Sequence, residues 1–117
     1  ADLYVDVSSA EGWGLPPLEA VACGVPMITV ADGLVRSEVH ARYAIDMLKP
    51  VHYCRWHTGA RLLLISPADV ARAIKCARLK IEHGDYVDYS QEVMRDLKWS
   101  VAGDKFADLI VRAYNKI

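Results

Sequence analysis

Two glutamates flank a glycine-rich turn near the start of the chain. Glu11 and Glu19 are separated by seven residues, among which stand Gly12 and Gly14. Carboxylates accept hydrogen bonds from sugar hydroxyls, and glycine lets the main chain approach a ligand closely. The spacing therefore predicts a site in which one carboxylate binds one sugar of a ligand, the other binds a second sugar, and a diphosphate lies between them.

The residues around this turn predict a strand followed by a helix. Apolar and polar side chains alternate over residues 3–9, and Pro16 opens a helix that Gly24 ends in a left-handed conformation. Ligands of open α/β sheets bind at the carboxyl ends of the strands. We therefore expect Glu11 at the mouth of the site, Glu19 on the first helical turn, and free N–H groups at the helix start for a phosphate.

The remaining chain alternates between strand and helix signals. Helices are expected where apolar residues recur at helical spacing, and strands where short apolar runs lie between turns. Together they predict a parallel α/β sheet of three or four strands with four helices. The further strands are expected at 25–30, 61–65 and, more weakly, 47–53; the further helices are expected at 66–84, 88–98 and 100–117.

Composition indicates one small domain with reduced thiols. Lys and Arg number 14 against 15 Asp and Glu, so no basic surface for nucleic acid is indicated. The odd set Cys23, Cys54 and Cys76 favours a cytoplasmic location, either free or peripheral to a membrane.

Apolar runs fall short of the roughly 20 residues that span a bilayer. Because the chain opens on a buried strand, we expect 1–117 to be a single, partial domain whose upstream strands are absent.

The full string Glu-Gly-Trp-Gly-Leu-Pro-Pro-Leu-Glu-Ala, followed by Gly-Val-Pro-Met-Ile, resembles a family motif. It is similar to the Glu-x7-Glu motif of the retaining GT-B glycosyltransferases of group 1, family GT4. The resemblance is close over residues 2–30 and looser at 32–39, 66–74 and 97–100; Ser37 stands where the family has proline. The glycines alone would be equally compatible with a purely structural turn.

The resemblance implies the C-terminal part of a Rossmann-like, nucleotide-sugar-binding domain. A sugar, of hexosyl type, would pass from a nucleotide-sugar to an acceptor with retention at the anomeric carbon. Glu11 would contact the transferred sugar as the catalytic carboxylate, and Trp13 would replace the usual phenylalanine or tyrosine. The donor-binding residues would be Gly12, Trp13, Gly14, Leu15 and, on the ribose, Glu19.

The same resemblance implies which partners the domain has. The nucleotide-sugar is a substrate, no cofactor or metal is expected, and a carbohydrate, lipid or protein acceptor is bound by a separate N-terminal domain. An upstream Arg and Lys would neutralise the diphosphate, so we expect the fragment alone to be inactive. The alternative is a non-catalytic GT-B-like subunit used for binding or assembly; the intact pair Glu11 and Glu19 favours the enzyme.

Several further residues admit two interpretations. His52, Cys54, His57 and the nearby His40 could suggest a metal site, but their spacing fits no zinc pattern and a surface loop is favoured. Tyr53, Arg55 and Trp56 could stack on a ligand, although a loop anchor is preferred.

Two expectations concern packing. Cys23 is expected as a small core residue rather than a nucleophile. The apolar stripe from Phe106 to Ile117 could bind a partner, but we expect its helix to pack on its own domain.

Overall fold

A three-stranded parallel sheet forms the centre of the protein. The computed structural model describes residues 1–10, 12–31, 35–55, 57 and 61–115. The strands lie in the order β1–β2–β3, and their bounds are Tyr4–Val5, Met27–Val30 and Ala44–Leu48. Strands and helices alternate along this part of the chain, and the predicted parallel α/β class is confirmed.

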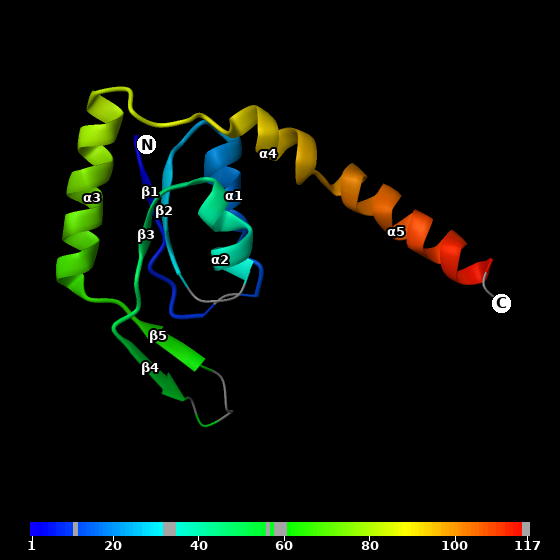
Figure 1. Ribbon diagram of the computed structural model, residues 1–117, viewed down its shortest axis with the longest axis horizontal. Coiled ribbons are helices and arrows are strands. Elements are labelled where there is room, and N and C mark those ends of the chain that lie inside the picture. The colour runs from blue at the N-terminus through cyan, green and yellow to red at the C-terminus, as the bar shows by residue number, and fades with distance from the viewer. Residues whose placement is uncertain (11, 32–34, 56, 58–60, 116–117) are drawn as a thin grey trace.

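Helices cover both faces of the sheet (Figure 1). The connections β1 to β2 and β2 to β3 run through helices on one face, and α3 lies on the other. The helices are α1 (Leu15–Ala22), α2 (Val35–Glu38), the 3-10 helix η1 (His40–Arg42), α3 (Pro67–Glu82), α4 (Ser90–Asp96) and α5 (Trp99–Tyr114).

The central strand β2 supplies both halves of the core. All of its residues are buried, and successive side chains of a strand point to opposite faces. Met27 therefore packs with Leu18, Val21, Tyr43 and Val93 under α1 and α4. On the other face, Ile28 and Val30 pack with the small residues of α3; that cluster comprises Ile28, Val30, Leu48, Leu63, Ala73 and Ala77. Burial on both faces explains why β2 is apolar throughout except at Thr29.

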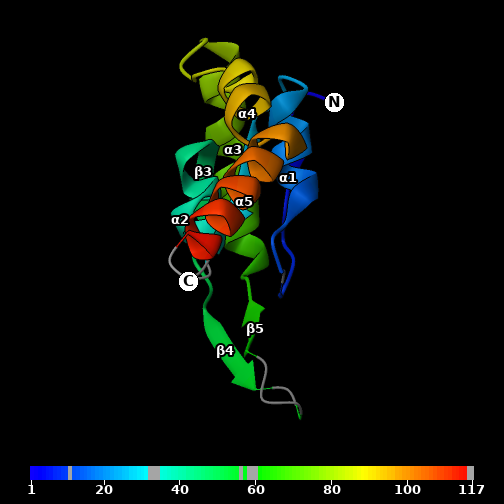
Figure 2. The same cartoon turned by 90° about the vertical axis from the view of Figure 1, so that its right-hand side faces the viewer.

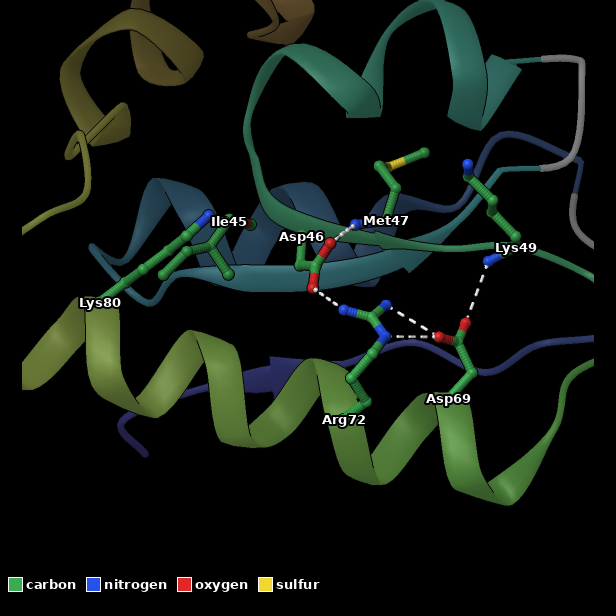
Figure 3. Close-up of polar contacts among 7 residues, drawn as sticks. All are labelled: Ile45, Asp46, Met47, Lys49, Asp69, Arg72 and Lys80. Atoms are coloured by element: carbon green, nitrogen blue, oxygen red, sulfur yellow. Dashed lines mark hydrogen bonds and ion pairs between the residues drawn. The ribbon is translucent and has the colours of Figure 1, made fainter.

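A polar network sets the position of α3 along β3 (Figure 3). Nη1 of Arg72 lies 3.2 Å from Oδ2 of Asp46, and Nε of Arg72 donates to Oδ1 of Asp69 at 2.8 Å. Oδ2 of Asp69 in turn accepts the backbone N–H of Lys49 at 3.3 Å. These side chains are partly exposed, so each pair contributes little to stability. Their main consequence is to align the start of α3 with the end of β3.

A hairpin stands where the sequence predicted a further parallel strand. β4 (His52–Arg55) pairs antiparallel with β5 (Arg61–Leu64), and the hairpin extends beyond the end of the sheet in both views (Figures 1 and 2). Parallel pairing needs a crossover of a dozen or more residues, which the short link between these strands does not provide. The strand predicted at 61–65 does form and Leu63 is buried, but its pairing is antiparallel rather than parallel, and Leu64 is exposed.

The weak strand expected at 47–53 is divided between two elements. β3 ends at Leu48, and β4 begins at His52. Pro50, which lacks an N–H to donate to a ladder, lies between them. A proline that interrupts the pairing explains why one apolar run yields parts of two strands.

The last helix does not pack on its own domain, contrary to expectation. No residue of α5 is buried, and Phe106 is 66% exposed. α4 already covers α1 through Val93, and the two residues that follow it direct α5 away from the body (Figure 1). The radius of gyration of 17.0 Å accordingly exceeds the value of about 13 Å for a compact chain of this length. Within the described part of the chain, no helix is both long enough and apolar enough to cross a membrane.

Candidate functional site at the carboxyl edge of the sheet

The segments that follow the parallel strands meet at one edge of the sheet. Because the strands are parallel, the turn after β1, the segment that leads from β2 into α2, and the end of β3 all lie at their carboxyl ends. The turn after β1 carries the glutamate and glycine string. Glu11 and residues 32–34 lie outside the described residues.

Gly14 is the N-cap of α1 and adopts a left-handed conformation. Its φ is 73° and its ψ is 60°, a region that favours glycine. Pro16 and Pro17 follow in the first turn, as the sequence predicted. Since proline has no N–H, only Gly14 and Leu15 carry donors among the cap and the first three helical positions. The helix start therefore offers fewer main-chain donors to a phosphate than its position alone suggests.

The side chain of His40 packs against Gly14. The side chain of His40, at the start of η1, is fully buried. A Cβ added to Gly14 would lie 2.8 Å from Cε1 of His40, which is closer than real contacts allow. Gly14 is thus required both by its backbone conformation and by the imidazole beside it. In the sequence, His40 is considered only as a residue near a possible metal site, and this contact is not predicted.

Trp13, Leu15 and Glu19 line one groove between α1 and α4. The groove has a volume of about 190 Å³, and its opposite wall comes from α4 and the link to α5. A neighbouring groove of about 390 Å³ continues from Trp13 and Leu15 along the first turns of α5, past Lys105. Glu19 is exposed and lies on the second turn of α1, not on the first as expected, because the helix begins at Leu15. The structure thus brings three of the predicted site residues together and turns Gly14 toward His40.

A buried polar network lies directly behind the turn. Asp6, 4% exposed, follows β1; its Oδ1 accepts the N–H of Ser8 at 2.9 Å and its Oδ2 accepts the hydroxyl of Thr29 at 3.0 Å. Arg36 of α2 is 1% exposed, and its Nη1 donates to Oδ2 of Asp6 at 3.2 Å and to the carbonyl of Ser8 at 3.0 Å.

This network determines the charge of Asp6. Burial by itself raises the pKa of Asp6, but the hydrogen bonds from Ser8, Thr29 and Arg36 together outweigh it and lower the pKa below its usual value. Asp6 is therefore an anion at neutral pH, paired with the cation of Arg36. Sequence analysis missed both residues. The sequence offered one signal: Asp6 is an acid within a run of alternating apolar residues, and the basic residue Arg36 lies in the connection after β2.

The residues considered for a metal site do not form one group among the described residues. His40 lies at Gly14, His57 is exposed, and no group of three potential metal ligands occurs among the described residues. The side-chain roles considered for His52, Tyr53, Cys54, Arg55 and Trp56 lie outside what the structure describes.

Cys23 is not the core residue that the sequence predicted. It is exposed, because it caps the C-terminus of α1 one position beyond the last helical residue. Gly24, with a φ of 77°, ends the helix as expected.

A family model matches the N-terminal part of the chain, which contains the carboxyl edge of the sheet. Residues 1–52 match the family model described as glycosyl transferases group 1. The matched segment contains the whole parallel sheet, α1 and α2. Comparisons with curated proteins and with solved structures give no significant match. The match supports a relation to the group 1 glycosyltransferases for these 52 of the 117 residues, and the parallel α/β arrangement is consistent with their Rossmann-like domain.

Proposed function

We propose that this protein transfers a sugar from a nucleotide-sugar to an acceptor with retention, and that this chain supplies part of the donor site. One observation carries the proposal. In the segment that matches the group 1 glycosyltransferases, the turn after β1 follows the carboxyl end of a strand of a parallel sheet, and Glu19 lies on the next helix. Ligands bind at that edge in open α/β folds.

The proposed donor lies across the start of α1. Glu19 accepts hydrogen bonds from the ribose, and the groove that it shares with Trp13 and Leu15 offers apolar surface beside it. The N–H groups of Gly14 and Leu15 face the diphosphate. Because prolines remove two of the usual donors here, we expect cations outside this segment to supply much of the phosphate binding. Glu11 accepts hydrogen bonds from the transferred sugar.

The proposed reaction exchanges one bond at the anomeric carbon. The bond from that carbon to the diphosphate oxygen breaks, and a bond to the acceptor oxygen forms on the same face. The acceptor proton passes to the departing diphosphate, so atoms and charge balance without an enzyme nucleophile. In this scheme the protein binds the donor and stabilises the charge that develops during departure.

Nucleotide binding and turnover test the proposal. The natural full-length protein is titrated with UDP, GDP, ADP and CDP in a calorimeter, and the corresponding nucleotide-sugars are then assayed for release of the nucleoside diphosphate. We expect one nucleotide to bind and Glu19→Gln to weaken it about tenfold or more. Glu82→Gln, an exposed glutamate in an ion pair at the far end of α3, is the control and leaves binding unchanged.

Two outcomes contradict the proposal. If none of the four nucleotides binds, the donor-site assignment is wrong. If a nucleotide binds but no nucleotide-sugar turns over in the presence of carbohydrate, lipid and protein acceptors, the chain is a binding subunit rather than part of an enzyme.

A further inference from the structure

We propose that Asp6 and Arg36 are positioning residues that hold the turn bearing Glu11 against α2. The consequence for sugar transfer rests on the function proposed above, but the positioning itself does not. The contacts place the pair between the end of β1, the centre of the sheet and α2, and join it directly to the main chain at Ser8.

The turn is attached at its beginning from two sides. On one side, Nη1 of Arg36 donates to the carbonyl of Ser8 at 3.0 Å. On the other side, the N–H of Leu63 in β5 donates to the carbonyl of Ser9 at 2.9 Å. Asp6 completes the attachment by accepting the N–H of Ser8 at 2.9 Å. The residues immediately before Glu11 are therefore fixed between α2 and the hairpin.

The same segment that carries Arg36 also contacts the end of the turn. α2 continues into η1, whose first residue, His40, packs against Gly14. Arg36 and His40 thus contact the turn at Ser8 and at Gly14, on either side of Glu11. A displacement of this segment would move both ends of the turn together.

Global stability alone cannot reveal the positioning role of this pair. Both charges are almost fully buried, and replacing a buried ion pair by neutral groups of similar size is often neutral or stabilising. An apolar pair could fill the same space, but it would leave the carbonyl of Ser8 without the donor of Arg36. The test therefore has to remove the charges in a balanced way and observe the turn separately from global stability.

The double variant Asp6→Asn/Arg36→Met meets this requirement. Asparagine keeps an oxygen for the N–H of Ser8, and no lone buried charge remains. Asp46→Asn/Arg72→Met is a matched control, because Asp46 also accepts a backbone N–H through Oδ1 and also lies 3.2 Å from an arginine Nη1 (Figure 3). That pair joins β3 to α3 and makes no hydrogen bond or ion pair with the described residues of the turn.

Three measurements are made on each full-length protein. Hydrogen exchange followed by mass spectrometry reports on the peptide that contains residues 7–15, thermal denaturation reports on global stability, and calorimetry reports on nucleoside diphosphate binding. We expect the Asp6/Arg36 double variant to melt within a few degrees of the wild type, while exchange in residues 7–15 accelerates about tenfold or more. The Asp46/Arg72 variant leaves that exchange unchanged.

The outcomes separate the two proposals. Unchanged exchange at 7–15 in the folded Asp6/Arg36 variant overturns the positioning role, whatever the nucleotide result. If exchange at 7–15 is faster in the Asp6/Arg36 variant but the wild-type protein binds no nucleotide, positioning is supported and the proposed function is overturned. If the double variant does not fold, Arg36→Lys takes its place. It keeps the charge of the pair but loses the guanidinium fork, and unchanged exchange in this variant also overturns the proposal.

Discussion

At the scale of single residues, the turn after β1 depends on a contact between Gly14 and His40. A left-handed φ is common for glycine and costs other residues roughly 1–2 kcal/mol. Gly14 and Gly24 have nearly the same φ, 73° and 77°, but only the Cβ position of Gly14 meets another residue within 4 Å. The two glycines therefore allow the conformational cost to be separated from the steric cost.

We expect Gly14→Ala to lower the free energy of unfolding more than Gly24→Ala does. The Gly24 variant loses about 1–2 kcal/mol from its backbone conformation. The Gly14 variant loses in addition about 1–3 kcal/mol because its methyl group overlaps the ring of His40. Urea unfolding of the two variants measures the difference, and equal losses would show that the imidazole moves aside without cost.

The proposed roles of the two glutamates differ in what a substitution should change. A hydrogen bond to the ribose is the same in the ground state and the transition state, whereas one to the transferred sugar strengthens as positive charge develops on its ring. Glu11→Gln should therefore lower kcat about tenfold or more while the Kd for the nucleoside diphosphate stays near the wild-type value. Steady-state kinetics and calorimetry on the complete enzyme measure both. Turnover within about a factor of two would contradict the role of Glu11.

At the scale of elements, the pair of Asp6 and Arg36 predicts how stability changes in acid. The folded pKa of Asp6 lies below its unfolded value of 3.8. The stabilisation is therefore complete well above 3.8 and is lost as pH falls through the lower, folded pKa. We expect the wild type to lose more stability between pH 5 and pH 2.5 than Asp6→Asn/Arg36→Met does.

Urea midpoints measured across this pH range test the expectation. Asp88 and Asp96 also have lowered pKa values, from hydrogen bonds with Ser90 and Arg95. Both proteins retain these two carboxyls, so their effect cancels in the comparison. Parallel pH profiles would mean that Asp6 has the same pKa in the folded and unfolded chain.

The elements that the sequence predicted well are those with local end signals. α1 ends before Gly24, and α3 begins after Ser66 at a proline and ends before Gly84, close to the expected bounds. The hairpin was missed because an apolar run does not reveal its pairing partner or direction. The contacts behind the site were missed for the same reason. Asp6 and Arg36 are 30 residues apart, and neither residue alone indicates a buried pair.

At the scale of the whole molecule, α5 extends from the body with its apolar residues exposed. A side chain that is exposed in the folded state gains little from folding, whereas a buried one gains roughly 1.5–3 kcal/mol. α4 and α5 are consecutive helices with opposite surroundings: Val93 is 5% exposed and Phe106 is 66% exposed. The two helices therefore contribute very differently to the stability of the body.

We expect Val93→Ala to lower the free energy of unfolding by about 2 kcal/mol and Phe106→Ala to leave it nearly unchanged. Val93 belongs to the core cluster under α1, and Phe106 belongs to no core cluster of the described residues. Chemical denaturation of both variants at low protein concentration measures the contrast. A comparable loss for Phe106→Ala would show that α5 packs on the body in solution.

The order of the strands in the sheet also bears on how the chain folds during synthesis. Because β1, β2 and β3 are neighbours in the order in which they are translated, the sheet can grow by one strand at a time as the chain leaves the ribosome. Pairing of β1 with β2 brings Asp6 to Thr29, and Arg36 joins them only when α2 packs against the sheet. Because an unpaired charge is costly to bury, Asp6 keeps its contact with water until α2 brings Arg36 to it.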